Sequence, residues 1–373
     1  MELTHNFVDP AYAEALDIFK KIKADLKRSQ IVVTVKGKTV IDLAAGVSPD
    51  SLTTVFSVSK ALSGISIAKL VGEGKLNLDE RMSHYWPEFA QNGKAELTVR
   101  QVLSHQCGLT DTDPRLTEDQ IYDDHAAAQA LAAQKPLWRP GSAFGYHGLT
   151  IGHLMSELVF RITGLTMQQY YEKEVRTPAD ADAYLGLPET LESRVTELSM
   201  NPVITNVGDE EKYARPAGWQ PGGVSDWGMG QVPLDDMVGR KGRAFGLSSG
   251  MGVASARGLV ATMQWAVGFG NQTPGVAKSA LDDMSQVQVY GYDILLEQDH
   301  RSHGTIFMKP TQNLPFGSYK AFGHDGAAGA LLYADPQGEI VLGYTVARLA
   351  FPGGADRAIQ PIIDLVRKVA NQN

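Results

Sequence analysis

A serine hydroxyl and a lysine amine lie three residues apart, at Ser57 and Lys60, in the segment TVFSVSKALSG (residues 54–64). At the start of a helix this spacing places both side chains on one face. A serine hydroxyl is a weak nucleophile until a base removes its proton, and a lysine buried against a packed core has a lowered pKa that suits this work. The pattern predicts that Lys60 activates Ser57 for attack on a carbonyl carbon. The alternative is a solvated first turn of a helix.

The spacing alone does not identify a site, because Ser66 and Lys69 repeat it farther along the same stretch. Inside a helix the backbone N–H is bonded within the helix, whereas the N–H groups of the first turn have no intrahelical acceptor. Because Ser57 stands at the helix start, its N–H is free to stabilise a developing oxyanion. We therefore expect Ser57 rather than Ser66 to be the nucleophile.

A rival nucleophile is Ser248, since residues 246–250 read G-x-S-x-G. In an α/β-hydrolase this serine stands on a sharp turn between a buried strand and a helix. Its triad partners would follow in the order Asp283 or Asp293, then His324. However, residues 239–243 are basic and glycine-rich instead of apolar, and no repeated βαβ pattern surrounds them. The alternative is a glycine-rich loop that leads into a helix over residues 256–269.

Tyr146 precedes an amphipathic helix that stops at Gly164, and it follows a loop that contains Pro140 and Gly141. A tyrosine in a loop is usually a packed ring with its hydroxyl in water. It can instead act as a phenolate base if a nearby ammonium stabilises its charge, and Lys60 would supply that charge.

His324 stands in a glycine-rich segment at the start of a predicted strand, where a ligand can approach the backbone closely. A lone histidine is more often structural than catalytic. His300 and His303 form H-x-x-H, but the glutamate of a metalloprotease helix and other plausible ligands are missing. We therefore expect neither a metal site nor a cofactor.

Strands and helices at both ends of the chain bracket a helical middle. Hydrophobic periodicity predicts helices over 11–27, 58–71, 151–163 and 356–370, and strand hairpins that turn at 36–38 and at 335–338. Ends that share one sheet around a helical insert predict an α/β plus α fold. Residues 1–75 and 246–373 would form the α/β part and residues 76–245 the mostly helical part, with the active site between them. A loose loop in the middle carries Trp219 and Trp227, which either line a pocket or anchor the loop.

Composition excludes several other classes of protein. The 373 residues carry a net charge of −8, which argues against nucleic acid or an anionic membrane as the main partner. No stretch approaches the roughly 18 apolar residues that span a bilayer, and the N-terminus does not read as a signal peptide. Cys107 is the only cysteine, so no internal disulfide can form, which permits a reducing compartment. We expect a cytoplasmic protein that acts on a small molecule.

Three segments in order resemble the serine hydrolases built like class C β-lactamases and penicillin-binding proteins, particularly the family VIII carboxylesterases. Those families have Ser-x-x-Lys near the start, a tyrosine motif near the middle, and Lys-Thr-Gly or His-x-Gly on a strand near the end. The matching segments are Ser57-Val58-Ser59-Lys60, Tyr146-His147-Gly148 and His324-Asp325-Gly326. The resemblance covers nearly the whole chain, most weakly over residues 177–242. It implies a β-lactamase-like (transpeptidase-like) fold, with an antiparallel sheet flanked by helices and a mostly helical second domain.

The resemblance also implies roles for particular residues. Ser57 would be the acylated nucleophile, Lys60 and Tyr146 would share the proton transfers, and the N–H groups of Ser57 and Ala327 would form the oxyanion hole. The residues that would line the substrate site are His324, Gly326, His147, Trp219 and Trp227. His105 and Cys107 would be structural.

Two departures from the β-lactamase pattern bear on the substrate. His324 replaces the lysine of Lys-Thr-Gly, a cation suited to a β-lactam carboxylate, and Gly148 replaces an asparagine that would contact an acyl-amino side chain. Both replacements favour neutral esters, so the resemblance implies a carboxylesterase that hydrolyses short acyl or aryl esters. A β-lactamase, a D-amino-acid peptidase or an acyltransferase on the same scaffold is the alternative, and a non-enzymatic binding protein is a third.

Overall fold

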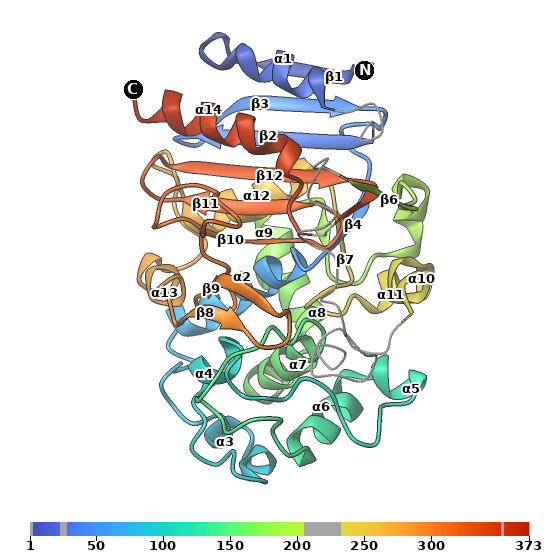
Figure 1. The fold of residues 1–373 in the computed structure, drawn as a ribbon, viewed down its shortest axis with the longest axis vertical. Coiled ribbons are helices and arrows are strands. Elements are labelled where there is room, and N and C mark those ends of the chain that lie inside the picture. Colours follow the sequence, from blue (N-terminus) through green and yellow to red (C-terminus); the bar gives the residue numbers. More distant parts are fainter. Residues whose placement is uncertain (1–2, 23–27, 205–232, 352–353, 373) are drawn as a thin grey trace.

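One antiparallel sheet joins the two ends of the chain. The structure is a computed structural model that describes residues 3–22, 28–204, 233–351 and 354–372. Neighbouring strands of the six-stranded sheet are antiparallel throughout (Figure 1). Their order is β1 (Leu3–Val8), β3 (Lys38–Ala45), β2 (Ser29–Val35), β12 (Ile340–Val346), β11 (Leu331–Asp335) and β10 (Phe322–Asp325). The predicted sharing of one sheet by both ends is therefore confirmed.

Successive side chains along each strand point to opposite faces of the sheet, so the interior contains two apolar cores, one on each face. Ile31 and Val33 of β2 pack with helices α1 (Glu14–Lys21) and α14 (Gln360–Ala370) on one face of the sheet. Val32 points to the other face and packs with α2 (Ser59–Gly72) and α12 (Ala256–Val267). All seven residues of β2 are buried, as expected for a central strand covered on both faces. Helix α2 thus begins beside the sheet and runs through the larger core.

Helices gather at the end of the molecule away from β1 (Figure 1). They are α3 (Met82–Tyr85), α4 (Val99–Leu103), α5 (Glu118–Ile121), α6 (Asp124–Ala133), α7 (Thr150–Thr163) and α8 (Met167–Tyr171). Two strands also fall in the middle of the chain. β5 (Ala183–Tyr184) pairs with β7 (Gly252–Ala254), and β6 (Ser199–Ile204) pairs with β13 (Arg348–Phe351). The boundaries at residues 75/76 and 245/246 stay a prediction.

Most periodic segments form the expected elements, including both hairpins and the helices α2, α7, α12 and α14. Helix α7 ends at Gly164, whose φ of 73° is the left-handed conformation of a helix C-terminus. At the N-terminus, α1 is shorter than expected and residues 23–27 lie outside the described part. Sequence reasoning missed β1 and the hairpin of β8 (Val289–Asp293) and β9 (Gln298–His303), because polar residues obscure their alternation. In the described part of the chain, no helix is long and apolar enough to cross a membrane.

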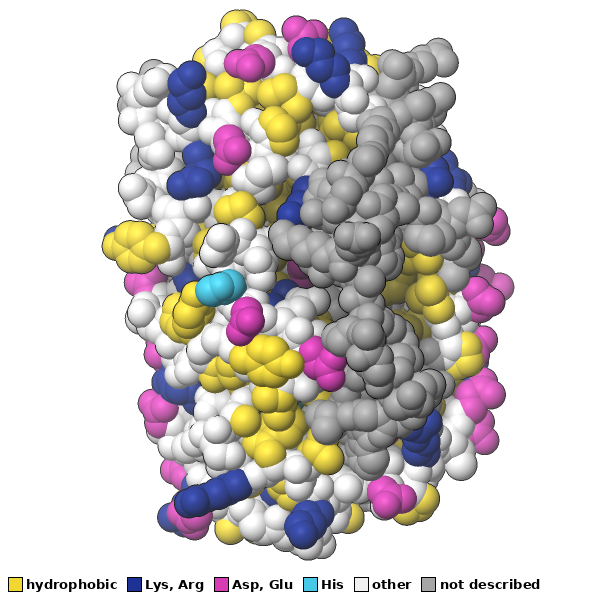
Figure 2. Space-filling view, viewed as in Figure 1, with side chains coloured by type: hydrophobic (Ala, Val, Ile, Leu, Met, Phe, Trp, Pro, Cys, Tyr) yellow, Lys and Arg dark blue, Asp and Glu magenta, His cyan; other side chains and the backbone are white. Residues whose placement is uncertain are grey.

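The molecular face in Figure 2 carries charges of both signs scattered around its rim, with hydrophobic side chains gathered toward the middle. Exposed aromatic residues of the β8–β9 hairpin include Tyr290 and Tyr292. Over the described part of this face, positive and negative side chains are interspersed.

Candidate active site

Ser57 occupies a tight turn between strand β4 (Thr53–Phe56) and helix α2. Phe56, directly before it, has a φ of 48°, a left-handed conformation that costs a non-glycine residue about 1–2 kcal/mol. Ser59 holds the turn in place, because its hydroxyl donates to the Phe56 carbonyl and accepts from the N–H of Gly252 at 2.8 Å. Ser59 therefore stabilises the turn, and Ser57 lies directly before the start of helix α2.

Lys60 is fully buried, and its amine has three oxygen neighbours. Nζ lies 3.2 Å from the Ser57 hydroxyl oxygen and 2.6 Å from each of the carbonyl oxygens of Gly148 and Ser249. Carbonyl oxygens only accept hydrogen bonds, so each of them takes one N–H of the amine. A neutral amine has two N–H groups and one lone pair, so its lone pair then faces Ser57. This arrangement suits Lys60 to accept the serine proton.

Tyr146 approaches Ser57 from a separate part of the chain. Its hydroxyl donates a 2.7 Å hydrogen bond to the Ser57 oxygen, and its ring centroid lies 4.9 Å from the Lys60 amine. The structure thus brings together the three side chains that were predicted to be catalytic, although 89 residues separate Tyr146 from Ser57.

Burial decides the charges of the two groups beside Ser57. It lowers the pKa of Lys60 well below the ordinary value of 10.5, against a smaller opposite effect of the nearby Asp325 carboxylate. Burial also raises the pKa of Tyr146 above 10.0, more than its hydrogen bond to Ser57 lowers it. A neutral amine and a neutral phenol are therefore favoured over an ammonium and a phenolate.

The loop after β10 lies against the strand that leads to Ser57. A side-chain carbon added at Gly326 would lie only 2.3 Å from the carbonyl oxygen of Val55, so the two backbones approach very closely. This approach explains the glycine and brings the segment that contains Ala327 next to the nucleophile turn. The oxyanion hole formed by the N–H groups of Ser57 and Ala327 remains a prediction.

Four buried histidines surround the Tyr146 ring or adjoin it. The rings of His105, His303 and His324 have centroids 5.0, 5.8 and 5.9 Å from that of Tyr146, and His147 lies 4.5 Å from His105. Burial lowers the pKa of all four, that of His147 to about 3, so they are uncharged. Among the described residues, no group of histidine, cysteine and carboxylate side chains is arranged to hold a metal ion.

Similarity to known proteins agrees with this fold and this geometry. Over residues 19–366 the chain matches the family described as Beta-lactamase. The chain belongs to the Beta-lactamase family. The resemblance read from three short motifs is thus confirmed over nearly the whole length.

Relatives of this β-lactamase-family chain include esterases. It is 28% identical to "Esterase/beta-lactamase LipL" of Mycobacterium tuberculosis, over 86% of this chain and 77% of that protein. It is 36% identical to EstA from Arthrobacter nitroguajacolicus Rue61a, with a TM-score of 0.88 and coverage of 100% and 99% of the two chains. A family VIII carboxylesterase, at 24% identity and a TM-score of 0.84 over the full length of both chains, shares the fold. The β-lactamase-family chain is a serine hydrolase.

The rival nucleophile Ser248 has a structural role in this β-lactamase-family fold. Its side chain is fully buried and donates to the carbonyl of Gly152 in α7 at 3.1 Å, while its own carbonyl accepts from Ser63 in α2 at 2.9 Å. The glycine-rich segment therefore packs against two helices and does not present a hydroxyl at a strand–helix turn. The next residue, Ser249, contributes to the site only through its backbone carbonyl.

Of the other residues predicted to line the substrate site, His324 lies near the Tyr146 ring, whereas His147 faces the core. The Nδ1 of His324 faces the Asp325 carbonyl at 2.8 Å, and among the described residues its buried Nε2 has no partner. His147 contacts Cys107, with 3.6 Å between Nε2 and Sγ, so it lies on the side of His105 and the core. Burial raises the pKa of Cys107 to about 12, in keeping with a packed thiol. The predicted Trp219 and Trp227 lie outside the described residues.

Sequence reasoning missed several groups of the site. Backbone carbonyls such as those of Gly148 and Ser249 carry no signal in residue type. Arg301 of β9 was also missed: its guanidinium carbon lies 5.9 Å from the Tyr146 ring centroid, and its buried Nε has no hydrogen-bond partner in the described part of the chain. The only available signal was that Arg301 lies between the two histidines of H-x-x-H.

Proposed function

We propose that this serine hydrolase is a carboxylesterase that works through an acyl-enzyme on Ser57. The observation that carries the proposal is the position of the Ser57 oxygen, 3.2 Å from the Lys60 amine and 2.7 Å from the Tyr146 hydroxyl. A hydroxyl with a base on one side and a phenol on the other has the two partners that acyl transfer requires.

In the acylation step, the Ser57 oxygen bonds to the ester carbonyl carbon while its proton passes to the lone pair of Lys60. The carbonyl oxygen becomes an oxyanion that the N–H groups of Ser57 and Ala327 stabilise. When this intermediate collapses, the bond to the leaving alkoxide breaks and the Tyr146 hydroxyl gives it a proton. Lys60 returns its proton to Tyr146, so the step ends with a free alcohol and a neutral amine.

Deacylation reverses these roles. A water molecule attacks the acyl carbon while its proton passes to the same pair of groups, and the Ser57 oxygen recovers a proton as the acid leaves. No net proton is stored on the enzyme, which agrees with burial that favours the neutral forms of both groups.

Short acyl or aryl esters without charge are the proposed substrates. At the positions where β-lactamases of this type carry a lysine and an asparagine, this chain has the uncharged His324 and Gly148. The relative LipL is named "Esterase/beta-lactamase", which supports ester hydrolysis and is equally compatible with the second candidate.

Turnover of β-lactams is the second candidate, and Arg301 favours it. Its guanidinium carbon lies 5.9 Å from the Tyr146 ring centroid, which places a cation beside the site that a substrate carboxylate would seek. Arg301 could therefore supply the positive charge that β-lactamases of this type obtain from a lysine at the position of His324.

A panel of p-nitrophenyl esters against nitrocefin separates the two candidates. The proposal predicts that acetate and butyrate esters are hydrolysed with a kcat/KM at least about a hundredfold above that of nitrocefin, and that Ser57→Ala abolishes both activities. Arg301→Gln should lower nitrocefin turnover by a larger factor than it lowers the turnover of neutral esters, because only the β-lactam carries a carboxylate. Rapid nitrocefin hydrolysis without ester hydrolysis would reverse the ranking.

A further inference from the structure

Asp293 lies at the end of β8 and is completely buried. One of its carboxylate oxygens accepts hydrogen bonds from the backbone N–H groups of Leu295 and Leu296 at 3.0 and 2.9 Å, which closes the turn of the β8–β9 hairpin. The N–H of Tyr146 points at both oxygens of the same carboxylate, at 3.2 and 3.0 Å. A single side chain therefore holds both the hairpin turn and the backbone of the tyrosine.

Two further contacts join residues 144–146 to the same turn. The N–H of Ile294 donates to the carbonyl of Phe144 at 3.2 Å. Gly145 faces the side chain of Leu295 so closely that an added side-chain carbon would lie 2.7 Å from its Cγ. Residues 144–146 thus run directly along residues 293–295.

The same hairpin also supports the Tyr146 ring. His303 of β9 stacks on the ring, with 5.8 Å between centroids and 18° between planes, and the guanidinium carbon of Arg301 lies 5.9 Å from the ring centroid. These neighbours limit rotation of the ring. The distance between the Tyr146 hydroxyl and Ser57 depends on the position of the Tyr146 backbone, to which Asp293 is hydrogen-bonded. The Asp293 carboxylate reaches the site through its hydrogen bonds with the Tyr146 N–H, and the charge of Arg301 also acts on it.

We propose that Asp293 is a positioning residue, which fixes the Tyr146 hydroxyl at hydrogen-bond distance from the nucleophile by binding the tyrosine's own backbone N–H. This inference rests on the proposed function, in which Tyr146 is the proton donor to the leaving alcohol. A buried carboxylate bonded to three N–H groups is rigid, and a shift of about 1 Å in a catalytic group can cost about a hundredfold in rate.

The test is a double-mutant cycle between Asp293→Asn and Tyr146→Phe, with turnover expressed per active site titrated with a fluorophosphonate. Asparagine has nearly the same shape but places an NH₂ group against N–H donors. Asp293→Asn should lower kcat by about ten- to a hundredfold with KM within about threefold. In the Tyr146→Phe background the same change should cost less than about twofold, since the hydroxyl that it positions is already absent.

Asp299→Asn is the matched control, because it makes the same change of charge at an exposed position of the same hairpin. If Asp293→Asn does not fold, Gly145→Ala tests the approach of residues 144–146 to the same turn, since its added carbon would meet the Leu295 side chain, and it should also lower kcat. A kcat for the Asp293 variant equal to that of the control, or an equal loss with and without the Tyr146 hydroxyl, would overturn the inference. Failure of the proposed function is distinguishable, since the wild-type enzyme would then neither react with the fluorophosphonate at Ser57 nor turn over esters.

Discussion

At the scale of single residues, the surroundings of Lys60 decide which group removes the serine proton. The amine is buried, two carbonyl oxygens occupy two of its N–H groups, and its pKa is lowered by loss of water. The Tyr146 pKa is raised by the same cause. At neutral pH Lys60 is therefore in the neutral form that can accept a proton, and Tyr146 is in the protonated form that can donate one.

This assignment predicts an acid limb in the pH profile of kcat/KM. Lys60 works as a base only when it is neutral, so activity should be lost as the pH falls through its lowered pKa and should be retained above it. Lys60→Arg should lower turnover at least about a hundredfold, because a guanidinium stays charged at every working pH.

Lys69→Arg is the matched control, since Lys69 lies on the same helix and pairs with Glu73 at 2.9 Å. Its turnover should stay within about twofold of wild type. Activity that appears only in alkaline solution, where the Tyr146 phenolate forms, would contradict the assignment of Lys60 as the base.

At the scale of elements, the site depends on close approach between two loops. The turn between β4 and α2 presents Ser57, and the loop after β10 lies against it because Gly326 has no side chain. Neither loop is a helix or a strand, so hydrophobic periodicity cannot predict its conformation. The distance between the two loops nevertheless determines whether the Ala327 N–H can reach an oxyanion.

Gly326→Ala should therefore impair catalysis more than folding. The added carbon would meet the Val55 carbonyl at 2.3 Å, so the loop must move away from Ser57. Loss of one oxyanion donor costs about 10²–10³ in kcat, and we expect at least a hundredfold loss per titrated site. Gly338→Ala is the control, because its nearest neighbours are the flexible end of Ile340. Turnover equal to that of the control would show that the loop is not part of the site.

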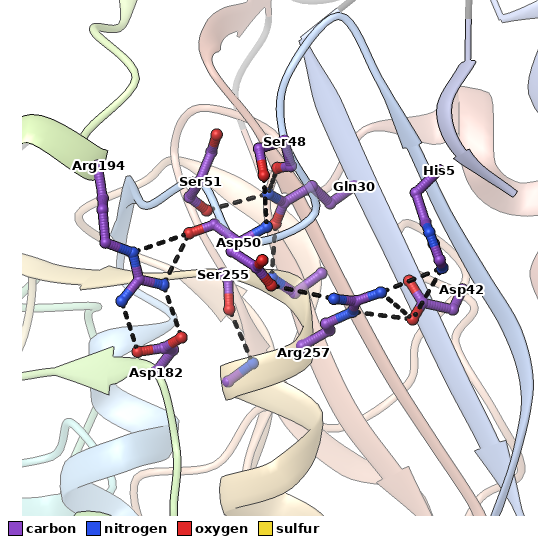
Figure 3. A network of polar contacts seen from close by, with 12 residues as sticks. His5, Gln30, Asp42, Ser48, Asp50, Ser51, Asp182, Arg194, Ser255 and Arg257 are labelled. Atoms are coloured by element: carbon purple, nitrogen blue, oxygen red, sulfur yellow. Dashed lines mark hydrogen bonds and ion pairs between the residues drawn. The ribbon is translucent and has the colours of Figure 1, made fainter.

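At the scale of the whole molecule, a polar network fixes the segment that leads from β3 toward Ser57 (Figure 3). Gln30 donates to the carbonyls of Ser48 and Ser51, at 2.7 and 3.0 Å, and accepts from the N–H that begins α12. Arg257 of α12 pairs with Asp42 and Asp50. The chain therefore enters β4 from a segment tied to both the sheet and α12, which limits the movement of the nucleophile turn.

Sequence alone was sufficient to predict the helices and hairpins with strong hydrophobic periodicity, and to predict that Ser57 lies beside Lys60. For Tyr146 the residues alone left open a packed ring or a phenolate base beside Lys60, and the resemblance was needed to choose a catalytic role; burial in the structure favours the neutral phenol over the phenolate. The G-x-S-x-G reading of Ser248 suggested Asp293 as a possible triad member, whereas in the structure its carboxylate binds backbone N–H groups around Tyr146. Contacts of this kind depend on tertiary structure, since every residue except proline offers the same N–H group.

The most direct test of the central claim is the site of covalent labelling by a fluorophosphonate. The account predicts that the reagent adds its mass to the peptide that contains Ser57, that Ser57→Ala abolishes the adduct, and that Tyr146→Phe slows its formation. A label on Ser248, or an undiminished label in the Ser57→Ala protein, would contradict the account.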